Sequence, residues 1–477
     1  MEKLISAADF SVEHFDHDSS PSLGALRWAY ELFRFEARIS LQGTLFAIGE
    51  DGMIVATAYG GTDNRLVGLQ DAPDADHPER QWTHDGIGAV SRSVVAVDAK
   101  GRIYACSMGG TDAGRLQAIL HVLRVDQAKT ARELWQEALF DPETPRAQPN
   151  ISAITVSGDI VYYAHNVIGG YRVLARHADT GESLWRHEAR GFAGRPCLGP
   201  DGVLYVPVEA GGNGAIIGLE ADTGKPVAVD DATNHVYYHR LSFDHEGRMF
   251  ATERRYQEGT AVGGSAVHVF LRDAASGHYK KSHRIELGDT GQHIETTLIA
   301  GASATLYGVS GHETIVSGRV AQATSMVWAI DARDAKILWA RPVSGRIAGS
   351  PTLGADGTLY LSVLANAASV DDRSVATCQA QVHALHARSG APRWIARLPD
   401  VDFDQAARGR YPGLTAPVLD GDGTVLVGIS AIKEAKQGDV QRGCYLLALR
   451  GDEPLARTAW PIENGNAGHT GTAPRQD

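Results

Sequence analysis

The stretches GADGTLYLSV (residues 354–363) and VHALHARSGAPRW (residues 382–394) contain the pattern that decides the fold. Asp-Gly at 356–357 precedes alternating apolar and polar residues, and this dipeptide before β-branched or aromatic residues is a strong short-range signal of a β-hairpin. The second stretch has an alternating strand, a polar turn at 388–390 and a further strand that ends at Trp394. We therefore expect about four short antiparallel strands here.

The same hairpin signal recurs along the chain at intervals of 43 to 66 residues. A repeat of this length with about four strands predicts an all-β fold, an eight-bladed β-propeller of four-stranded antiparallel blades. We expect a single propeller at residues 23–474 after an N-terminal extension at residues 1–22. The eight signals are centred on Gly52, Gly101, Asp159, Gly202, Gly247, Ala304, Gly357 and Gly423.

The triplet Asp-Thr-Gly at 179–181 and 222–224 is also the triplet of aspartic proteases, which use two carboxylates that share one proton. Other copies of the repeat have Arg-Ser-Gly at 388–390 and Ala-Ser-Gly at 275–277 in the same place. A catalytic aspartate would not be replaced by arginine or alanine. Because glycine supplies a positive φ in tight turns, we interpret the triplet as a turn and reject the protease.

Composition excludes some classes of protein. The chain has 45 basic and 57 acidic residues and a net charge of −12, which argues against binding to nucleic acid phosphates. No apolar run approaches the ~18 residues that span a membrane, and the N-terminus lacks the apolar core of a signal peptide. The four cysteines have no CxxC spacing and do not require an oxidising compartment. We expect a soluble, cytoplasmic protein without a membrane span.

The repeats resemble those of the pyrroloquinoline-quinone-like (PQQ-like) repeat family, over about residues 40–474. The residues that carry the resemblance are GPDGVLYVPV (199–208), HADTGESLW (177–185), the two stretches quoted above and the tail WPIENGNAGHTGTAP (460–474). The resemblance implies tryptophan-docking repeats, in which a tryptophan that ends the outermost strand packs between neighbouring blades.

Two segments are candidates for closing the ring, because the sequence contains nine outer-strand segments but only eight sets of inner strands. Either the segment around Trp28 or the segment around Trp460 completes the last blade. We favour the Trp28 strand, which would tie both ends of the chain into one ring.

Candidate site residues come from the first strand of each blade, which lines the central channel of a propeller. Positions aligned on the hairpin signals, and positions two residues earlier, lie on one face because side chains alternate along a strand. We expect His293, Glu295 and Tyr238 as catalytic residues, if there is catalysis, and Arg92, Asn150, His239, Arg240 and Arg346 as ligand-binding residues. Arginine suits a carboxylate or phosphate, and a His–Glu pair suits proton transfer. The alternative is a polar channel filled with water and ion pairs.

We expect no metal site. Asp400, Asp402 and Asp404 have the alternate spacing of a calcium loop, but Gln405 replaces the glycine that such a loop needs. His383 and His386 lie three residues apart on an expected strand, which places them on opposite faces.

Long segments between the second and third strands of blades 5–8 are a second candidate for function. Loops longer than the fold requires are usually functional or disordered. They would form a lid or a rim that binds a protein partner. The segments are residues 254–266, 311–325, 364–380 and 431–444.

The family resemblance implies three alternatives for function. Quinoprotein dehydrogenases hold quinone and calcium over a disulfide of adjacent cysteines, and this chain has no adjacent cysteines. The scaffold lipoproteins of outer-membrane barrel assembly need a lipobox cysteine near the N-terminus, whereas the first cysteine here is Cys106. We therefore expect no cofactor. The remaining alternative is a propeller that binds a small polar or anionic ligand or a protein partner, or a cofactor-independent lyase, cyclase/isomerase or hydrolase with its site at the channel mouth.

Overall fold

The structure is a computed structural model of the chain. It describes residues 5–16, 20–35, 46–58, 65–72, 77–85, 95–110, 116–139, 151–167, 169–210, 213–230, 233–234, 236–257, 260–261, 265–287, 293–294, 297–316, 319–365, 377–402, 413–434, 440–459, 461–463, 465–466 and 469–470. This part of the chain contains 39 strands and one short helical turn, η1 (Ala7–Asp9). No helix within it is long and apolar enough to cross a membrane.

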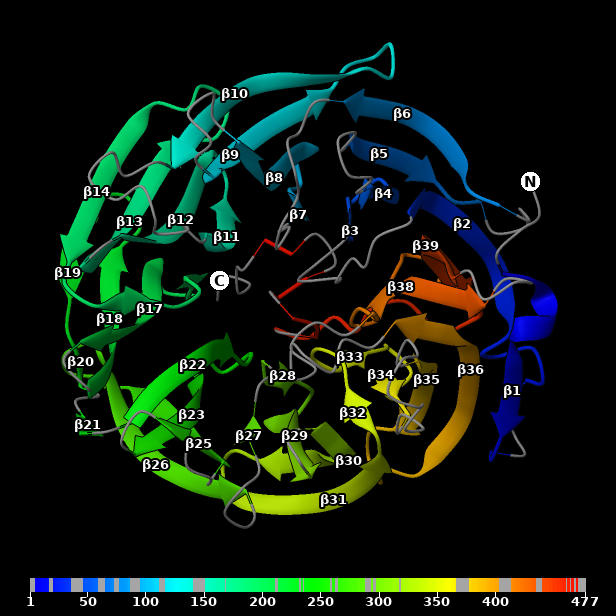
Figure 1. The fold of residues 1–477 in the computed structure, drawn as a ribbon. Coiled ribbons are helices and arrows are strands. Elements are labelled where there is room, and N and C mark those ends of the chain that lie inside the picture. The colour runs from blue at the N-terminus through cyan, green and yellow to red at the C-terminus, as the bar shows by residue number, and fades with distance from the viewer. Residues whose placement is uncertain are drawn as a thin grey trace.

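The fold is an all-β propeller, as the repeats predicted. Figure 1 shows the sheets standing around a central channel in chain order. Three sheets have four strands each, with every strand antiparallel to its neighbour. They contain β3 (Phe46–Ile48), β4 (Met53–Ala58), β5 (Arg65–Gln70) and β6 (Glu79–Asp85); β7 (Val95–Val97), β8 (Arg102–Gly110), β9 (Leu116–Val125) and β10 (Ala131–Leu139); and β11 (Ile151–Ser157), β12 (Ile160–Val167), β13 (Gly170–His177) and β14 (Ser183–Ala189).

Three further sheets have a similar core with extra short strands. They contain β15 (Phe192–Ala193), β16 (Cys197–Leu198), β17 (Val203–Ala210), β18 (Asn213–Glu220), β19 (Pro226–Val227) and β21 (Thr233–Asn234); β20 (Val229–Asp230), β22 (Val236–Phe243), β23 (Met249–Gln257), β24 (Thr260–Ala261), β25 (Ser265–Arg272) and β26 (Tyr279–Leu287); and β27 (His293–Ile294), β28 (Ile299–Ala300), β29 (Thr305–Val316), β30 (Arg319–Asp331) and β31 (Lys336–Ser344).

The last sheet has ten strands and contains the closure of the ring. Its two halves meet through one residue pair, Val401 and Ala431. The number of blades depends on whether this sheet is divided there, so eight blades stays a prediction. The strands are β32 (Arg346–Ile347), β33 (Thr352–Leu353), β34 (Thr358–Leu364), β35 (Thr377–His386), β36 (Pro392–Asp402), β37 (Val418–Leu419), β38 (Val425–Glu434), β39 (Val440–Leu449), β1 (Ser11–His14) and β2 (Leu26–Phe35).

The Trp28 strand closes the ring, as we favoured from the sequence. β2 pairs antiparallel with β39, from Leu26 opposite Leu449 to Phe35 opposite Arg442. Figure 1 shows these two strands, from opposite ends of the chain, side by side. Trp460 lies outside the described residues. The expected extension at residues 1–22 contributes β1, which adds a strand to β36, and the domain boundary itself stays a prediction.

The glycine turns and the tryptophans fit together as the repeat pattern indicates. Gly181, Gly224 and Gly390 have φ between 68° and 72°, and a Cβ at each would lie within 2.8 Å of a tryptophan ring. Each ring also donates from Nε1 to a carbonyl of the next blade, at 2.7 to 3.0 Å. The Asp-Thr-Gly triplets are therefore turns on which tryptophans dock, which confirms the interpretation from sequence. The three rings are those of Trp135, Trp185 and Trp339.

Two copies of the repeat lack the tryptophan, and the structure shows two different replacements. In one, His283 Nε2 lies 3.2 Å from Ala332 O, the carbonyl position that a tryptophan reaches elsewhere. Because a carbonyl only accepts, this ring nitrogen carries the proton. In the other, the chain passes from β19 into the next sheet, where β20 pairs in parallel with β26, at Val229 opposite Tyr279.

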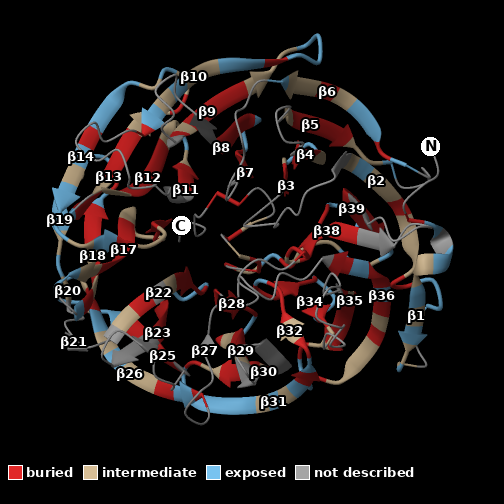
Figure 2. Cartoon of the chain, viewed as in Figure 1, coloured by how far each residue is buried: buried red, intermediate tan, exposed pale blue. Residues whose placement is uncertain are grey.

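Side chains become more exposed from the inner strands to the outer strands of the ring. Figure 2 shows buried residues concentrated in the inner and middle strands and exposed residues on outer strands such as β14 and β31. One of the long segments of blades 5–8 is strand rather than loop, because β29 and β30 continue to pair, past a register shift between Thr314 and Ile315, as far as Val316 opposite Arg319. A rim that binds a partner stays a prediction.

Candidate functional site

The predicted mouth residues are only partly described by the structure. Arg92, Asn150 and Glu295 lie outside the described residues. His293 lies in β27 and His239 in β22, but only their backbone is described. Arg346 begins β32 opposite Leu364 and is half-buried. The assembly of a mouth from these residues therefore stays a prediction.

Tyr238 packs into the core of its sheet. Its side chain is 6% exposed, and its ring lies edge-on to His268 at 5.2 Å and to Phe270 at 5.8 Å between centroids. From the sequence we expect this side chain at the channel mouth. A contact between Tyr238 and a ligand stays a prediction.

Arg240 contributes to a charged cluster with Arg195 and Glu463, two residues outside the predicted site. Arg195 Nη1 lies 2.7 Å and Arg240 Nη1 3.5 Å from Oε1 of Glu463, a residue of the C-terminal segment. Ser350 Oγ donates to the other oxygen, Oε2, at 3.3 Å. His469 Nδ1 donates to the Glu463 carbonyl oxygen at 3.0 Å. The C-terminal segment, red in Figure 1, thus crosses the channel and is held there by groups from different blades.

The electrostatics of this cluster favour a charged carboxylate and a neutral imidazole. Burial alone would raise the pKa of the Glu463 carboxyl, but the charges of Arg195 and Arg240 outweigh it and lower that pKa to about 2. Burial lowers the pKa of His469 to about 4. The side chains of Arg195, Arg240 and Glu463 remain 25%, 16% and 19% exposed, so solvent reaches the cluster.

A sequence signal for this cluster was present. Arg195, Arg240 and Ser350 each lie seven residues before the glycine of their hairpin signal. The expected mouth combines positions nine and eleven residues before it with the neighbouring His239 and Arg240, and the side-chain period of two puts position seven on the same face. One more step along the alternation would have found Arg195 and Ser350. Nothing local predicts that Glu463 meets them.

The C-terminal segment is also tied down through its backbone. Leu353 N donates to Pro461 O at 2.9 Å, Ala456 N to Leu353 O at 2.9 Å, and Val156 N to Thr470 O at 2.8 Å. Ile462 is 1% exposed. The segment is therefore a packed part of the ring.

Acid should loosen this segment through His469. The histidine pKa is about 6.5 in the unfolded chain and about 4 in the folded one, so the unfolded state takes up the proton first. The stabilisation is complete above about pH 6.5 and falls by on the order of 3 kcal/mol as the pH drops to 4. Asparagine tolerates the φ of 56° found at this position. We expect His469→Asn to show a weaker fall in urea stability between pH 7 and pH 4 than wild type, and parallel curves would contradict this.

A cavity of about 620 Å³ lies beside the C-terminal segment. Its wall contains the ends of β3, β7 and β11, near Ile48, Val97 and Val156, with the turns that follow them, and residues 455–459 of the segment. These turns join first and second strands, whereas the expected mouth is at the start of the first strands. The cavity therefore lies at the opposite end of the channel from the mouth.

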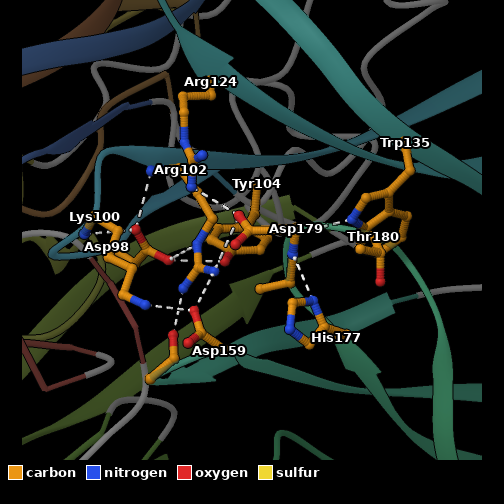
Figure 3. A network of polar contacts seen from close by, with 12 residues as sticks. Asp98, Lys100, Arg102, Tyr104, Arg124, Trp135, Asp159, His177, Asp179 and Thr180 are labelled. Carbon is orange, nitrogen blue, oxygen red and sulfur yellow. Dashed lines mark hydrogen bonds and ion pairs between the residues drawn. The ribbon is translucent and has the colours of Figure 1, made fainter.

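A buried ion network holds two of these turns together (Figure 3). The Arg102 side chain is fully buried; its Nε lies 2.6 Å from Asp98 Oδ2, its Nη1 2.9 Å from Asp159 Oδ1 and 3.3 Å from Asp179 Oδ1. Nη2 donates to Gly158 O. Asp179, from the first Asp-Thr-Gly triplet, also accepts from Arg124 at 2.7 Å. The triplet carboxylate is therefore an ion-pair partner between two blades.

The residues do not fit the quinone site that the resemblance implies. All four cysteines are free and buried, and each lies in a different hydrophobic cluster, so no pair supplies the disulfide. Among the described residues no group of three or more His, Cys, Asp or Glu side chains is placed to hold a metal ion.

Comparison with solved structures finds several similar chains. Solved structures that are similar include BamB from Moraxella catarrhalis, with 15% identity over 77% of this chain and 97% of that one and a TM-score of 0.42. The WD40 domain of SCAP from fission yeast has 9% identity over 89% and 98% of the two chains and a TM-score of 0.49. A protein from Lactobacillus plantarum has 14% identity over 70% and 95% and a TM-score of 0.44. No curated protein matches the chain.

The sequence also matches a family model. The match spans residues 120–395, more than half of the chain, and the model is described as outer membrane protein assembly factor BamB. The match lies within the repeats and does not test whether the protein carries the lipobox cysteine of a lipoprotein. The chain therefore belongs to this family of PQQ-like repeat propellers.

Proposed function

We propose that this propeller binds a small anionic molecule in its central channel, from the loop-rich end and without a quinone cofactor. One observation carries the proposal: Arg195 and Arg240 hold a carboxylate on the channel side of their strands while 25% and 16% of each side chain stays exposed. A guanidinium has five donors in a planar fork and can serve a second carboxylate or phosphate at its other edge.

The position of Arg346 supports the same site. It begins β32, four residues before Ser350 and toward the expected mouth. With the C-terminal segment across the channel, a ligand from the loop-rich end would meet Arg346 and then the Glu463 cluster. His293 and Glu295 would orient the ligand, or transfer a proton if the protein is a cofactor-independent enzyme.

A protein partner is the second candidate function, and two observations favour it. Phe192 in β15, beside the channel, is 60% exposed, and exposed aromatic residues are common anchors of protein interfaces. The family description names an assembly factor. A partner would bind on the loop-rich face, over the channel mouth.

The test begins with a screen of small carboxylates and phosphates for ligands that raise the melting temperature. For a ligand so found, we expect Arg346→Ala to weaken binding about ten- to a hundredfold, the loss of one charge-assisted contact of about 1.5–3 kcal/mol. Arg388→Ala, an exposed arginine in a turn of the same sheet, is the matched control and should bind like wild type. Titration with pyrroloquinoline quinone and calcium should give no absorbance change.

His293→Ala then separates the two function classes. It should lower turnover more than affinity if the ligand is a substrate, and change only affinity if the protein is a binder. If Arg346→Ala and His293→Ala both bind the ligand like wild type, the channel site is wrong. A protein captured through Phe192, and lost in Phe192→Ala, would support the second candidate.

A further inference from the structure

We propose that the 620 Å³ cavity at the other end of the channel is a second binding site, and that it takes a small zwitterion with an aliphatic side chain, the class of an aliphatic amino acid. Sites for small molecules enclose roughly 300–1,000 Å³ and combine apolar walls with a few polar groups. This cavity has both features.

The walls of the cavity are aliphatic. Ile48, Val97 and Val156 are each no more than 5% exposed, and Ala456 and Ala459 face them from the C-terminal segment and are also buried. No aromatic ring is among the described residues that line the cavity. This wall suits a short branched or straight hydrocarbon chain.

Three polar side chains without a described partner distinguish the cavity from a packing defect. Thr458 Oγ1 is buried and has no hydrogen-bond partner within the described part of the chain. Arg457 and Glu50 line the cavity, are exposed and form no side-chain hydrogen bond or ion pair with the described residues. A buried hydroxyl normally finds a partner, so Thr458 indicates a polar group on the occupant.

The charges at the rim select the class of ligand. Of the other charged lining residues, Lys100 is paired with Asp159 at 2.6 Å, and Asp98 is bonded to Arg102 and Tyr104. Arg457 and Glu50 then present one positive and one negative group. A simple anion would face Glu50 and a simple cation would face Arg457, whereas a zwitterion satisfies both.

Both sides of the cavity are fixed before any ligand arrives. Arg102 ties the Asp98 turn to Gly158 of the next turn, and Figure 3 shows Asp98, Lys100, Arg102 and Asp159 converging. On the other side, Asn466 and Thr470 bond to each other at 2.6 Å and 3.2 Å. A preorganised site loses less entropy on binding.

The experiment compares leucine, 4-methylpentanoate and 3-methylbutylamine on the full chain by calorimetry or ligand-observed NMR. We expect leucine to bind at one site and each singly charged analogue to bind about tenfold more weakly or worse. Arg457→Gln and Glu50→Gln should each weaken leucine binding about ten- to a hundredfold. The matched controls Arg388→Gln and Glu182→Gln are exposed turn residues elsewhere and should not change it.

Ala459→Phe should abolish leucine binding by filling the cavity. Circular dichroism of this variant is the check that it still folds. If Ala459→Phe does not fold, Arg457→Gln and Glu50→Gln still test the proposal, because both side chains are exposed and their replacement should not disturb the fold. Absence of leucine binding, equal binding of the three probes, or unchanged binding in Arg457→Gln would overturn the proposal. Arg346→Ala should leave leucine binding unchanged, which separates this site from the proposed anion site.

Discussion

Deletion of residues 1–40 should lower the stability of the whole ring more than any single substitution. It removes β2, which pairs with β39 along its length, and with it Trp28, which is only 2% exposed. Truncating one buried tryptophan to alanine already costs about 3–5 kcal/mol. Because a domain is stable by only about 5–15 kcal/mol, loss of the strand should leave a largely unfolded or aggregated chain.

The deletion also exposes the edge of β39, a row of unpaired backbone groups that invites aggregation. The deletion also removes an ion pair and a hydrogen bond of β2: Arg27 Nη1 lies 3.0 Å from Asp71 Oδ2, and Tyr445 Oη donates to Glu31 at 2.9 Å. The measurement is thermal unfolding followed by circular dichroism, with light scattering for aggregation.

A shorter deletion, residues 1–22, is the control. It removes β1, whose burial alternates between exposed and half-buried, but keeps β2. Its melting temperature should stay much closer to that of the full chain. If the deletion of residues 1–40 melts like the full chain, β2 does not hold the ring closed, and the Trp460 segment becomes the candidate for closure.

The fold was predictable because its signals are local. A glycine with φ near 70° is required at Gly181, Gly224 and Gly390, and the tryptophan one blade earlier needs that glycine because a Cβ would collide with its ring. These requirements recur at the copies that end at Trp135, Trp185 and Trp339, so the sequence repeats there too. Where a copy lacks the tryptophan, the alternation of apolar residues still marks its strands.

The channel was less predictable because its residues come together only through the ring. Counting back from each hairpin signal assumes that the side chains of every first strand alternate in the same register. In β22 the register shifts between Tyr238 and Leu241, so the count fails there. Glu463 and His469 belong to a segment with no strand pattern, and only tertiary packing puts them in the channel. A partner that is distant in sequence leaves no local signal.

Arg102→Met should lower the free energy of unfolding by about 3–5 kcal/mol, the second large effect we expect. The change keeps most of the side-chain volume and removes the charge. Asp98, which is 6% exposed, would then remain as a buried carboxylate without its cation, and Asp159 and Asp179 would lose their shared partner between blades. Urea unfolding at pH 7 measures the loss.

The matched control is Arg65→Met. Arg65 also pairs with a carboxylate, Asp85, but at 3.7 Å and with side chains 39% and 78% exposed. Exposed pairs contribute about 0–1 kcal/mol because water screens them and both side chains lose freedom. A loss as small in Arg102→Met as in Arg65→Met would show that the network is no stronger than a surface pair.

A double variant tests the physical cause. If the loss in Arg102→Met comes from the stranded charge of Asp98, then Asp98→Asn in the same chain should recover part of it, because a neutral amide is easier to bury than a carboxylate. The amide oxygen can still accept from the backbone of Lys100 and Arg102, which now donate to Asp98 Oδ1 at 2.9 Å. If instead the loss comes from the contacts of the guanidinium with the next blade, the double variant should be no more stable than Arg102→Met. The sign of the coupling free energy between Arg102→Met and Asp98→Asn therefore tells whether the loss comes from a buried, unpaired charge or from lost contacts between blades.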